Sequence, residues 1–460
     1  MSFLSVQFII LIIAVLVLLQ FIKSDVPGRL VLLAASYLFY ACFSLQALIL
    51  LILLSVFTWG SGAFVLRFLA SDQREKARLL CIGSVSLQVI VLLFFKFSGL
   101  FPMPVGLSFY MLQAISYIAD LYLGRLQMSP KLLDTLVYIG FFPQIVSGPI
   151  VKAKDFIPQL YERRALTKER LSYAVQMFAL GAFMKLVLAD RLAVCVDKVY
   201  AAPLAYSGLS LFITSIGYTL QLFFDFAGYS GMAIAVGWAL GFDLGQNFNL
   251  PYMASNPADF WRRWHISLST WLRDYVYIPL GGNRKGKTRT YINILLTMLV
   301  SGLWHGSTVN FLIWGALHGA GQAAHRMLRG DNKREQKVTG QIQQERGSSL
   351  RRIAAMVLNF LFVSFLWIPF RAETWGDAWT ILSRIFTLQS GIAYYYVYVF
   401  IFGALLLVVQ ILAGRFNNGN DPFKPLPLDR LYGKVIFCVL LLAIAMFAYF
   451  GNGAFIYAHF

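Results

Sequence analysis

The sequence predicts an all-α, polytopic membrane protein, because it is rich in apolar residues, poor in charge and divided into apolar runs of spanning length. Of its 460 residues, 58% are hydrophobic and only 13% are charged. A soluble domain has about a quarter of its residues charged, so half of the usual solvating groups are missing. A bilayer accounts for this deficit, because lipid-facing side chains are apolar.

The apolar runs predict about 11 transmembrane helices, with a few re-entrant or interfacial helices among them. The first run, residues 3–22, carries no charge and has about the 20 residues that a spanning helix needs. It lacks the basic start and small-residue cleavage site of a signal peptide, so we expect a retained helix. The later runs lie at about 30–44, 46–66, 79–97, 104–123, 132–150, 171–189, 208–224, 228–242, 290–304, 308–325, 353–370, 394–413 and 434–450.

We expect these helices to form one membrane domain over residues 1–460, interrupted by a polar cytosolic loop at about 329–350. Length alone would allow two or three soluble domains, but multi-helix membrane proteins of this length fold as one unit. No internal repeat is visible, which counts against an inverted-repeat transporter. The four cysteines show neither metal-ligand spacing nor a disulfide framework.

The net charge of +18 lies mainly in short connections between the apolar runs. No segment combines a basic stripe with a soluble core, so nucleic-acid binding is disfavoured. Basic loops of membrane proteins face the cytosol, and counting back from the first of them places the amino terminus outside. The basic connections lie at residues 67–78, 152–170, 284–289 and 326–352.

Residues 256–277 predict an amphipathic helix with an aromatic face. Asn256 is a good N-cap, Pro257 suits the first turn, and Asp259 favours the positive end of the helix dipole. Arg262, Ser269 and Arg273 lie roughly opposite the aromatic face, which suits an interfacial helix or one packed beneath others. The aromatic face consists of Trp261, Trp264, His265, Leu268, Trp271, Leu272 and Tyr275.

A basic turn with three glycines, YIPLGGNRKGKTR, follows at residues 277–289. Gly281 and Gly282 permit a tight bend, and the cations after them could meet phosphate groups. The same composition is also typical of an ordinary cytosolic loop.

His305 stands out in the next apolar run. It lies 16 residues beyond Arg289, which is about 24 Å along an unbroken helix. The hydrocarbon core is about 30 Å thick, so His305 is expected past its middle. An ionisable side chain at that depth indicates a functional site. His318 follows in a similar apolar setting between Gly315 and Gly319.

Three of the five histidines thus fall within 54 residues, on apolar or aromatic segments. Imidazole suits general-base catalysis because its reference pKa lies near working pH. An alcohol attacking a thioester needs a base, donors for the oxyanion and exclusion of water. Satisfied core histidines and a three-histidine metal site are the alternatives, although no carboxylate or cysteine stands at a supporting spacing. The chain has no GxSxG elbow and no Rossmann fingerprint.

Several motifs together resemble the membrane-bound O-acyltransferases, and most closely their bacterial branch that is similar to alginate O-acetyltransferases. The resemblance covers nearly the whole chain. Its motifs are VGLSFYMLQAISYIADLY at 105–122, FFPQIVSGPIVK at 141–152, LFFDFAGYSGMAIAVG at 222–237, NFNLPY at 247–252, FWRRWHISLSTWLRDYVYIPLGGNR at 260–284, GLWHG at 302–306 and the terminal FIYAHF.

This resemblance implies a tunnel that joins a cytosolic acyl donor, acetyl-CoA, to an outward-facing acceptor site. It implies that His305 is the near-invariant histidine of the family and that His265 is its second polar active-site position. It also implies a separate extracytoplasmic acetyltransferase of the SGNH type that modifies a polysaccharide, and a bacterial inner membrane as the location. D-alanyl transfer to teichoic acid from a carrier protein and peptidoglycan O-acetylation share many of these motifs, so donor and acceptor stay open.

We therefore predict an O-acyltransferase in which His305 is the general base or acyl relay. His265 is expected to position or polarise a reacting group, and His318 is expected to support the reaction. Residues expected at the donor entrance are Trp261, Arg262, Arg263, Trp264 and Asp274, and those expected in the tunnel are Asp225, Tyr229 and Asn249. No metal and no tightly bound cofactor are expected. The rival functions are a flippase for lipid-linked sugars, with histidines that relay protons, and a scaffold that only docks the outer acetyltransferase.

Overall fold

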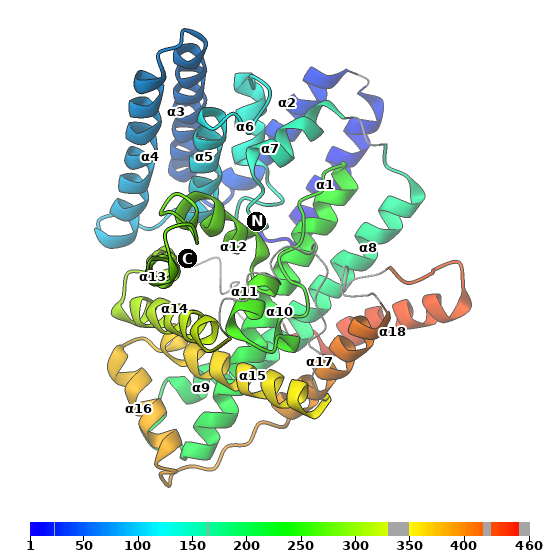
Figure 1. Cartoon of the computed structure of the whole chain (residues 1–460). Helices are drawn as coiled ribbons and strands as arrows, with labels where there is room; N and C mark the ends of the chain where they lie inside the picture. Colours follow the sequence, from blue (N-terminus) through cyan, green and yellow to red (C-terminus); the bar gives the residue numbers. More distant parts are fainter. Residues whose placement is uncertain (23, 163–164, 330–348, 417–424, 450–460) are drawn as a thin grey trace. The chain divides into compact units, whose positions relative to one another are not determined.

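A computed structural model describes residues 1–22, 24–162, 165–329, 349–416 and 425–449, and they are helical almost throughout (Figure 1). The all-α prediction is therefore confirmed; in the described ranges, two isolated bridges are the only β-type pairings. The polar loop predicted at about 329–350 falls mainly on residues outside those ranges, as do Arg163, Arg164 and the terminal FIYAHF.

Within the described ranges, four helices are long and apolar enough to cross a membrane: Leu45–Ala70, Arg74–Phe97, Gly208–Leu240 and Leu350–Arg371. The same ranges contain three shorter apolar helices, at Val6–Phe21, Val397–Leu412 and Leu431–Phe447. A membrane protein is thus supported, while the predicted count of about 11 spans stays a prediction.

The chain divides into two compact units, each of which is described by itself. The first unit comprises Met1–Ala182 and Gly228–Gln246, and the second comprises Phe183–Ala227 and Asn247–Gly453. The expectation of one membrane domain stays a prediction.

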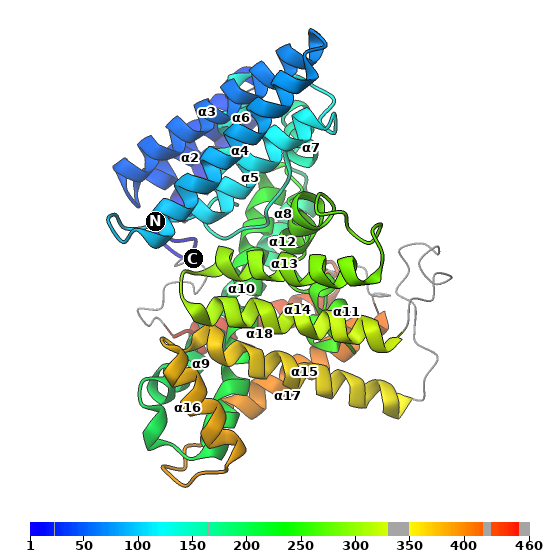
Figure 2. The same cartoon turned by 60° about the vertical axis from the view of Figure 1, so that its left-hand side comes forward.

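The first unit is built on α3, α4 and α5, which run side by side (Figures 1 and 2). Gly62 lets α3 approach α5, because a Cβ there would lie 2.7 Å from Tyr117 and Leu121 side-chain atoms. The helices of this unit are α1 (Val6–Phe21), α2 (Asp25–Ala41), α3 (Leu45–Ala70), α4 (Arg74–Phe97), α5 (Leu107–Tyr122), α6 (Leu132–Gly140), α7 (Ala153–Phe156) and α8 (Lys168–Phe183).

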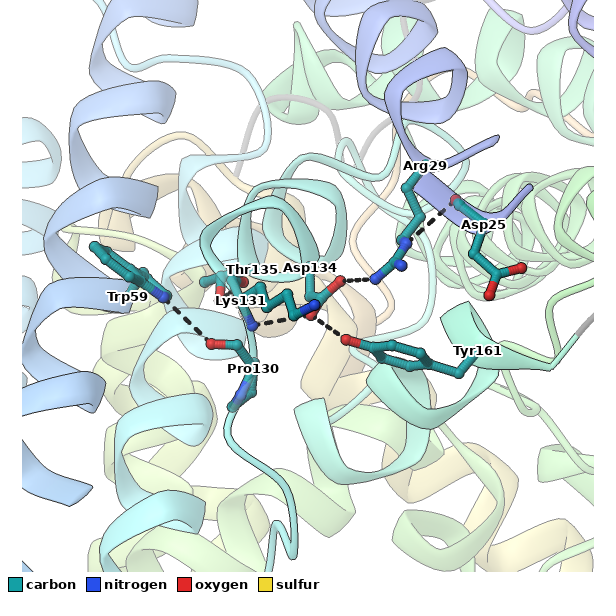
Figure 3. A network of polar contacts seen from close by, with 8 residues as sticks. All are labelled: Asp25, Arg29, Trp59, Pro130, Lys131, Asp134, Thr135 and Tyr161. Atoms are coloured by element: carbon teal, nitrogen blue, oxygen red, sulfur yellow. Dashed lines mark hydrogen bonds and ion pairs between the residues drawn. The ribbon is translucent and has the colours of Figure 1, made fainter. Parts of the chain in front are cut away.

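A buried ion pair ties α2 to α6 in this unit (Figure 3). The guanidinium of Arg29 meets the carboxylate of Asp134, whose side chain is wholly buried. The other Asp134 oxygen accepts from the Tyr161 hydroxyl at 2.6 Å and from the Lys131 backbone N–H at 2.9 Å. Each oxygen of the buried carboxylate thus has at least one donor, which is what allows a charge to be buried here.

The second unit places α13, α14 and α15 side by side (Figure 2). Its helices are α9 (Asp190–Tyr200), the amino-terminal part of α10 (Gly208–Leu240), α11 (Pro257–Arg263), α12 (Ile266–Leu272), α13 (Lys287–His305), α14 (Val309–Arg329), α15 (Ser349–Arg371), α16 (Trp375–Phe386), α17 (Val397–Phe416) and α18 (Leu431–Phe447). α10 ends in the first unit.

Three boundaries differ from the sequence-based expectation. The runs at 208–224 and 228–242 form the single helix α10, because Asp225 is neutralised by Lys185 and does not interrupt it. The run at 132–150 yields only the short α6, since Pro143 and Pro149 lack the N–H that a helix needs. α9 and α16 lie outside the apolar runs and were not predicted.

Replacing Asp134 by asparagine is expected to lower the free energy of unfolding by about 3 to 5 kcal/mol, because it leaves the Arg29 charge buried without an anion. Chemical unfolding in mixed micelles measures the change. The matched control is Arg74→Gln, whose ion pair with Asp72 has side chains 83% and 94% exposed. Equal destabilisation by both substitutions would contradict the stabilising role of the buried Arg29–Asp134 ion pair.

A row of histidines and tryptophans as the candidate active site

The helix predicted at 256–277 is broken at His265. Asn256 caps α11 as predicted, accepting from the Asp259 N–H at 2.8 Å. His265 then takes a left-handed conformation with φ 43°, and α12 begins at Ile266. After α12 the chain continues as a π-helical turn, Arg273–Tyr277. The single amphipathic helix was therefore a wrong expectation.

The NFNLPY segment holds this break in place. Asn249 N–H donates to the Arg263 carbonyl, and Ile266 N–H donates to the Asn247 carbonyl, both at 2.9 Å. These two bonds flank His265 and fix its backbone. A left-handed non-glycine residue costs of order 1–3 kcal/mol, and such strain concentrates at functional sites.

The hydrogen bonds around His265 indicate its tautomer. The Ser267 hydroxyl donates its proton to Asn247 Oδ1 at 2.6 Å, so it acts as an acceptor toward His265 Nδ1, 3.5 Å away. The imidazole proton then lies on Nδ1, and Nε2 carries the lone pair. The side chain is wholly buried.

His305 is the last residue of α13, which is unbroken from Lys287. The estimate of its depth from the sequence required such an unbroken helix. Its side chain is 2% exposed. Its ring meets those of Trp304, Trp314 and Phe370 edge-on, with centroids 4.8, 5.0 and 5.2 Å away.

The close crossing of α13 and α14 depends on glycines. A Cβ on Gly302 would overlap the Phe311 carbonyl oxygen, and one on Gly315 would overlap the Met298 carbonyl oxygen. Farther along α14, a Cβ on Gly319 would lie 3.0 Å from Leu295 Cα. This small-residue contact allows His305 and α14 to approach each other.

His318 lies on α14 and is wholly buried. Trp261 Nε1–H donates to its Nδ1 at 3.3 Å. Trp314, one turn earlier on the same helix, contacts both histidines: its centroid lies 4.9 Å from that of His318 and 5.0 Å from that of His305.

Two tryptophans thus connect the three histidines into one row. Trp304 contacts His265 at 6.0 Å and His305 at 4.8 Å, and Trp314 contacts His305 and His318. We call His265, Trp304, His305, Trp314 and His318 the histidine row. Segments that are up to 53 residues apart bring these side chains together, as the sequence-based hypothesis of a shared site requires.

The residues expected at the donor entrance differ in their surroundings. Trp261 and Trp264 are buried, Trp261 against His318 and Trp264 between Phe260 and Phe248. Arg262 is exposed, which suits contact with a ligand at the surface.

Arg263 and Asp274 are both held by neighbours. Arg263 pairs with Asp259 at 3.0 Å and also donates to the Asn249 carbonyl at 3.4 Å. Asp274 pairs with Arg273 at 2.8 Å. Their roles at a donor entrance stay predictions.

Among the residues expected in the tunnel, Asp225 has the partner that a buried carboxylate needs. Lys185 Nζ lies 2.6 Å from Asp225 Oδ1 and 2.8 Å from Asp190 Oδ1, and all three side chains are buried. Next to Asp225, Phe226 meets the ring of His265 at 4.7 Å. The ion cluster therefore anchors the part of α10 that packs on the histidine row.

The other two residues expected in the tunnel, Tyr229 and Asn249, have different surroundings. Tyr229 belongs to the first unit, where it stacks on Phe3 with centroids 4.8 Å apart, and it is not part of the row. Asn249 pins the backbone beside His265 through the bond described above. A tunnel-lining role for either residue stays a prediction.

The basic turn uses several of its backbone N–H groups in its own hydrogen bonds. Residues 281–288, GGNRKGKT, fit the letters of the nucleotide-binding pattern GxxxxGK[ST]. A phosphate cradle needs free backbone N–H groups, but those of Gly281, Gly282 and Arg284 donate to carbonyls within the turn. The residues before it are helical, whereas a P-loop follows a strand. Its arginine and lysine side chains are exposed.

The part of the chain that the structure describes holds no group of three His, Cys, Asp or Glu side chains placed to bind a metal ion. The histidines of the row are separated by indole rings, and each imidazole meets aromatic carbon.

Sequence reasoning singled out the histidines but missed the rings between them. Trp304, Trp314, Trp367 and Phe370 all contact the row or each other. Trp304 lies within the GLWHG segment at 302–306, and Trp314 begins the segment WGALHG at 314–319, so proximity to the histidines could have indicated both tryptophans. Trp367 and Phe370 lie on α15 and had no such indication.

Comparison with known proteins gives consistent matches. The model of the membrane-bound O-acyltransferase family matches residues 34–366. A protein named probable alginate O-acetylase from Pseudomonas aeruginosa is 36% identical over 410 residues, with 84% of this chain and 75% of that protein covered.

Two other relatives act on cell-wall polymers, by their names. A peptidoglycan O-acetyltransferase from Helicobacter pylori is 32% identical, with 81% of this chain and 76% of that protein covered. A teichoic acid D-alanyltransferase from Bacillus subtilis is 27% identical, with 68% and 83% covered.

Replacing Gly302 by alanine is expected to force α13 away from α14 and to cost about 1 to 3 kcal/mol of unfolding free energy. Chemical unfolding in micelles measures this cost. Gly83→Ala on α4 is the matched control, because a Cβ there meets nothing within 4 Å. If Gly302→Ala were as stable as Gly83→Ala, the close crossing would be refuted.

Proposed function

The chain belongs to the membrane-bound O-acyltransferase family, and we propose that it passes an acetyl group from cytosolic acetyl-CoA across the membrane for O-acetylation of an extracytoplasmic polysaccharide. Membership in the family makes it an O-acyltransferase. Acetyl as the transferred group, acetyl-CoA as the donor and the glycan acceptor are the proposed parts.

One observation carries the proposal: the relatives that cover most of this chain at 36% and 32% identity are both named for O-acetylation of a glycan. The relative named for D-alanyl transfer is 27% identical and matches a smaller share of the chain. Similarity therefore favours acetyl over D-alanyl as the acyl group.

The chemistry assigned to the histidine row is a proton transfer coupled to acyl transfer. The acceptor hydroxyl oxygen forms a bond to the thioester carbonyl carbon while His305 takes the hydroxyl proton. The C–S bond then breaks, and the leaving thiolate receives that proton. His265, whose ring is separated from that of His305 by Trp304, positions the acceptor from the other end of the row.

The surroundings of His305 support this role. Its aromatic neighbours exclude water, which protects the thioester from hydrolysis and strengthens local hydrogen bonds. The exposed Arg262, together with Arg284 and Lys285 of the basic turn, supplies cations for the donor phosphates.

The acyl group must finally reach a glycan outside the cytosol. We infer a separate extracytoplasmic acetyltransferase of the SGNH type as the partner that modifies the polysaccharide. The protein would lie in a bacterial inner membrane with its amino terminus outside, in line with the distribution of basic loops.

The proposal is tested with purified protein in proteoliposomes, radiolabelled acetyl-CoA, the outer acetyltransferase and a glycan acceptor. Wild-type protein is expected to label the glycan, and His305→Gln is expected to lose about 10²–10⁴-fold in rate, the usual contribution of a general base. His325→Gln is the matched control, because His325 lies on α14 outside the row.

Two results would contradict the proposal. Transfer that persists in His305→Gln would remove His305 from the mechanism. Wild-type protein that ignores acetyl-CoA but transfers D-alanine from a loaded carrier protein would replace the proposed donor and acyl group.

A further inference from the structure

Three wholly buried N–H donors belong to rings that contact one another, one of which also contacts His305, and none of the three has an acceptor among the described residues. They are Nε1 of Trp314, Nε1 of Trp367 and Nε2 of His318. An indole N–H can only donate a hydrogen bond. A buried donor without an acceptor costs about 1–3 kcal/mol, so three in one cluster call for a physical explanation.

The third donor follows from the tautomer of His318. Trp261 donates its indole N–H to Nδ1, so Nδ1 carries the lone pair. The proton of the neutral imidazole is therefore on Nε2. His318 thus acts as a hydrogen-bond donor here, which is a different role from the general base assigned to His305.

The three rings touch one another. The centroids of Trp314 and Trp367 lie 5.7 Å apart in a stacked arrangement. The His318 centroid lies 4.9 Å from that of Trp314 and 6.0 Å from that of Trp367. These side chains come from the adjacent helices α14 and α15.

The same cluster reaches His305 directly. Trp314 contacts His305 at 5.0 Å, and Phe370 contacts His305, Trp314 and Trp367 at 5.2, 5.3 and 5.1 Å. The donors and the proposed base are therefore parts of one continuous aromatic group. Of the three donor rings, that of Trp314 is in direct contact with His305.

We propose that Trp314, Trp367 and His318 form the binding site for the carbonyl oxygen of the transferred acyl group. The inference rests on the proposed function and adds catalytic residues to it. When the acceptor hydroxyl attacks, the electron pair of the C=O bond moves onto this oxygen, and the hydroxyl proton goes to His305. The N–H groups stabilise the resulting oxyanion until the pair returns and the C–S bond breaks.

An oxygen ligand fits this cluster better than a cation or an apolar ligand does. The three groups are donors, which a cation would repel and an apolar ligand would leave unsatisfied. The cluster has no fixed cation among its ring contacts, so a weakly basic carbonyl oxygen that gains charge during the reaction is the matching ligand.

The direct test replaces one atom in each indole. Incorporation of β-(3-benzothienyl)alanine at position 314 or 367 exchanges the N–H for sulfur and keeps the shape of the ring. The matched control is the same exchange at Trp379, which is 61% exposed on α16. Acetyl transfer is measured with acetyl-CoA in proteoliposomes, with separate determination of kcat and KM.

At positions 314 and 367 we expect kcat to fall by about 10²–10³-fold, as for loss of one oxyanion donor, with KM nearly unchanged. His318→Gln, which keeps an N–H donor, is expected to lose less activity than His318→Leu. Thermal unfolding in detergent should be the same for the benzothienyl variants and the wild type.

Wild-type rates in both benzothienyl variants would overturn the inference, as would a loss of activity that merely follows a loss of thermal stability. This failure is distinct from failure of the proposed function, because the wild-type protein would still transfer acetyl and His305→Gln would still be inactive.

Discussion

The close crossing of α13 and α14 is the constraint on which the rest of the candidate site depends. Gly302 and Gly315 let the two backbones approach until a Cβ would overlap a carbonyl oxygen of the other helix. Because His305 ends one helix and Trp314 lies on the other, this approach places their ring centroids 5.0 Å apart. The remaining contacts of the histidine row build outward from that pair.

Burial determines the hydrogen bonding and the tautomers of the imidazoles in the histidine row. An imidazole surrounded by indole and phenyl rings is kept from water, so its hydrogen bonds are strong and its tautomer is set by a few neighbours. Ser267 and Trp261 set different tautomers for His265 and His318, so the two side chains have complementary abilities to accept and to donate. The buried Lys185, Asp190 and Asp225 cluster then fixes the helix that carries Phe226 against His265.

The sequence was sufficient for the helical class, for most helices and for the three histidines, because these depend on apolar run length and on rare ionisable residues in apolar surroundings. It was insufficient for the break at His265, which depends on a hydrogen bond accepted by the Asn247 carbonyl and one donated by the Asn249 N–H and has no local signature. The sequence shows two apolar runs, 208–224 and 228–242, where the structure has one helix, and the partner of the intervening Asp225, Lys185, is 40 residues away. Trp367 could not be indicated, since only tertiary packing places α15 beside α14.

A cryo-electron microscopy structure with a non-hydrolysable acetyl-CoA analogue bound would locate the acyl group relative to the histidine row. We expect the acyl carbonyl carbon beside His305, with its oxygen about 3 Å from at least one N–H of Trp314, Trp367 or His318. An analogue whose acyl group lies elsewhere, with the histidine row unchanged and out of contact, would contradict this expectation.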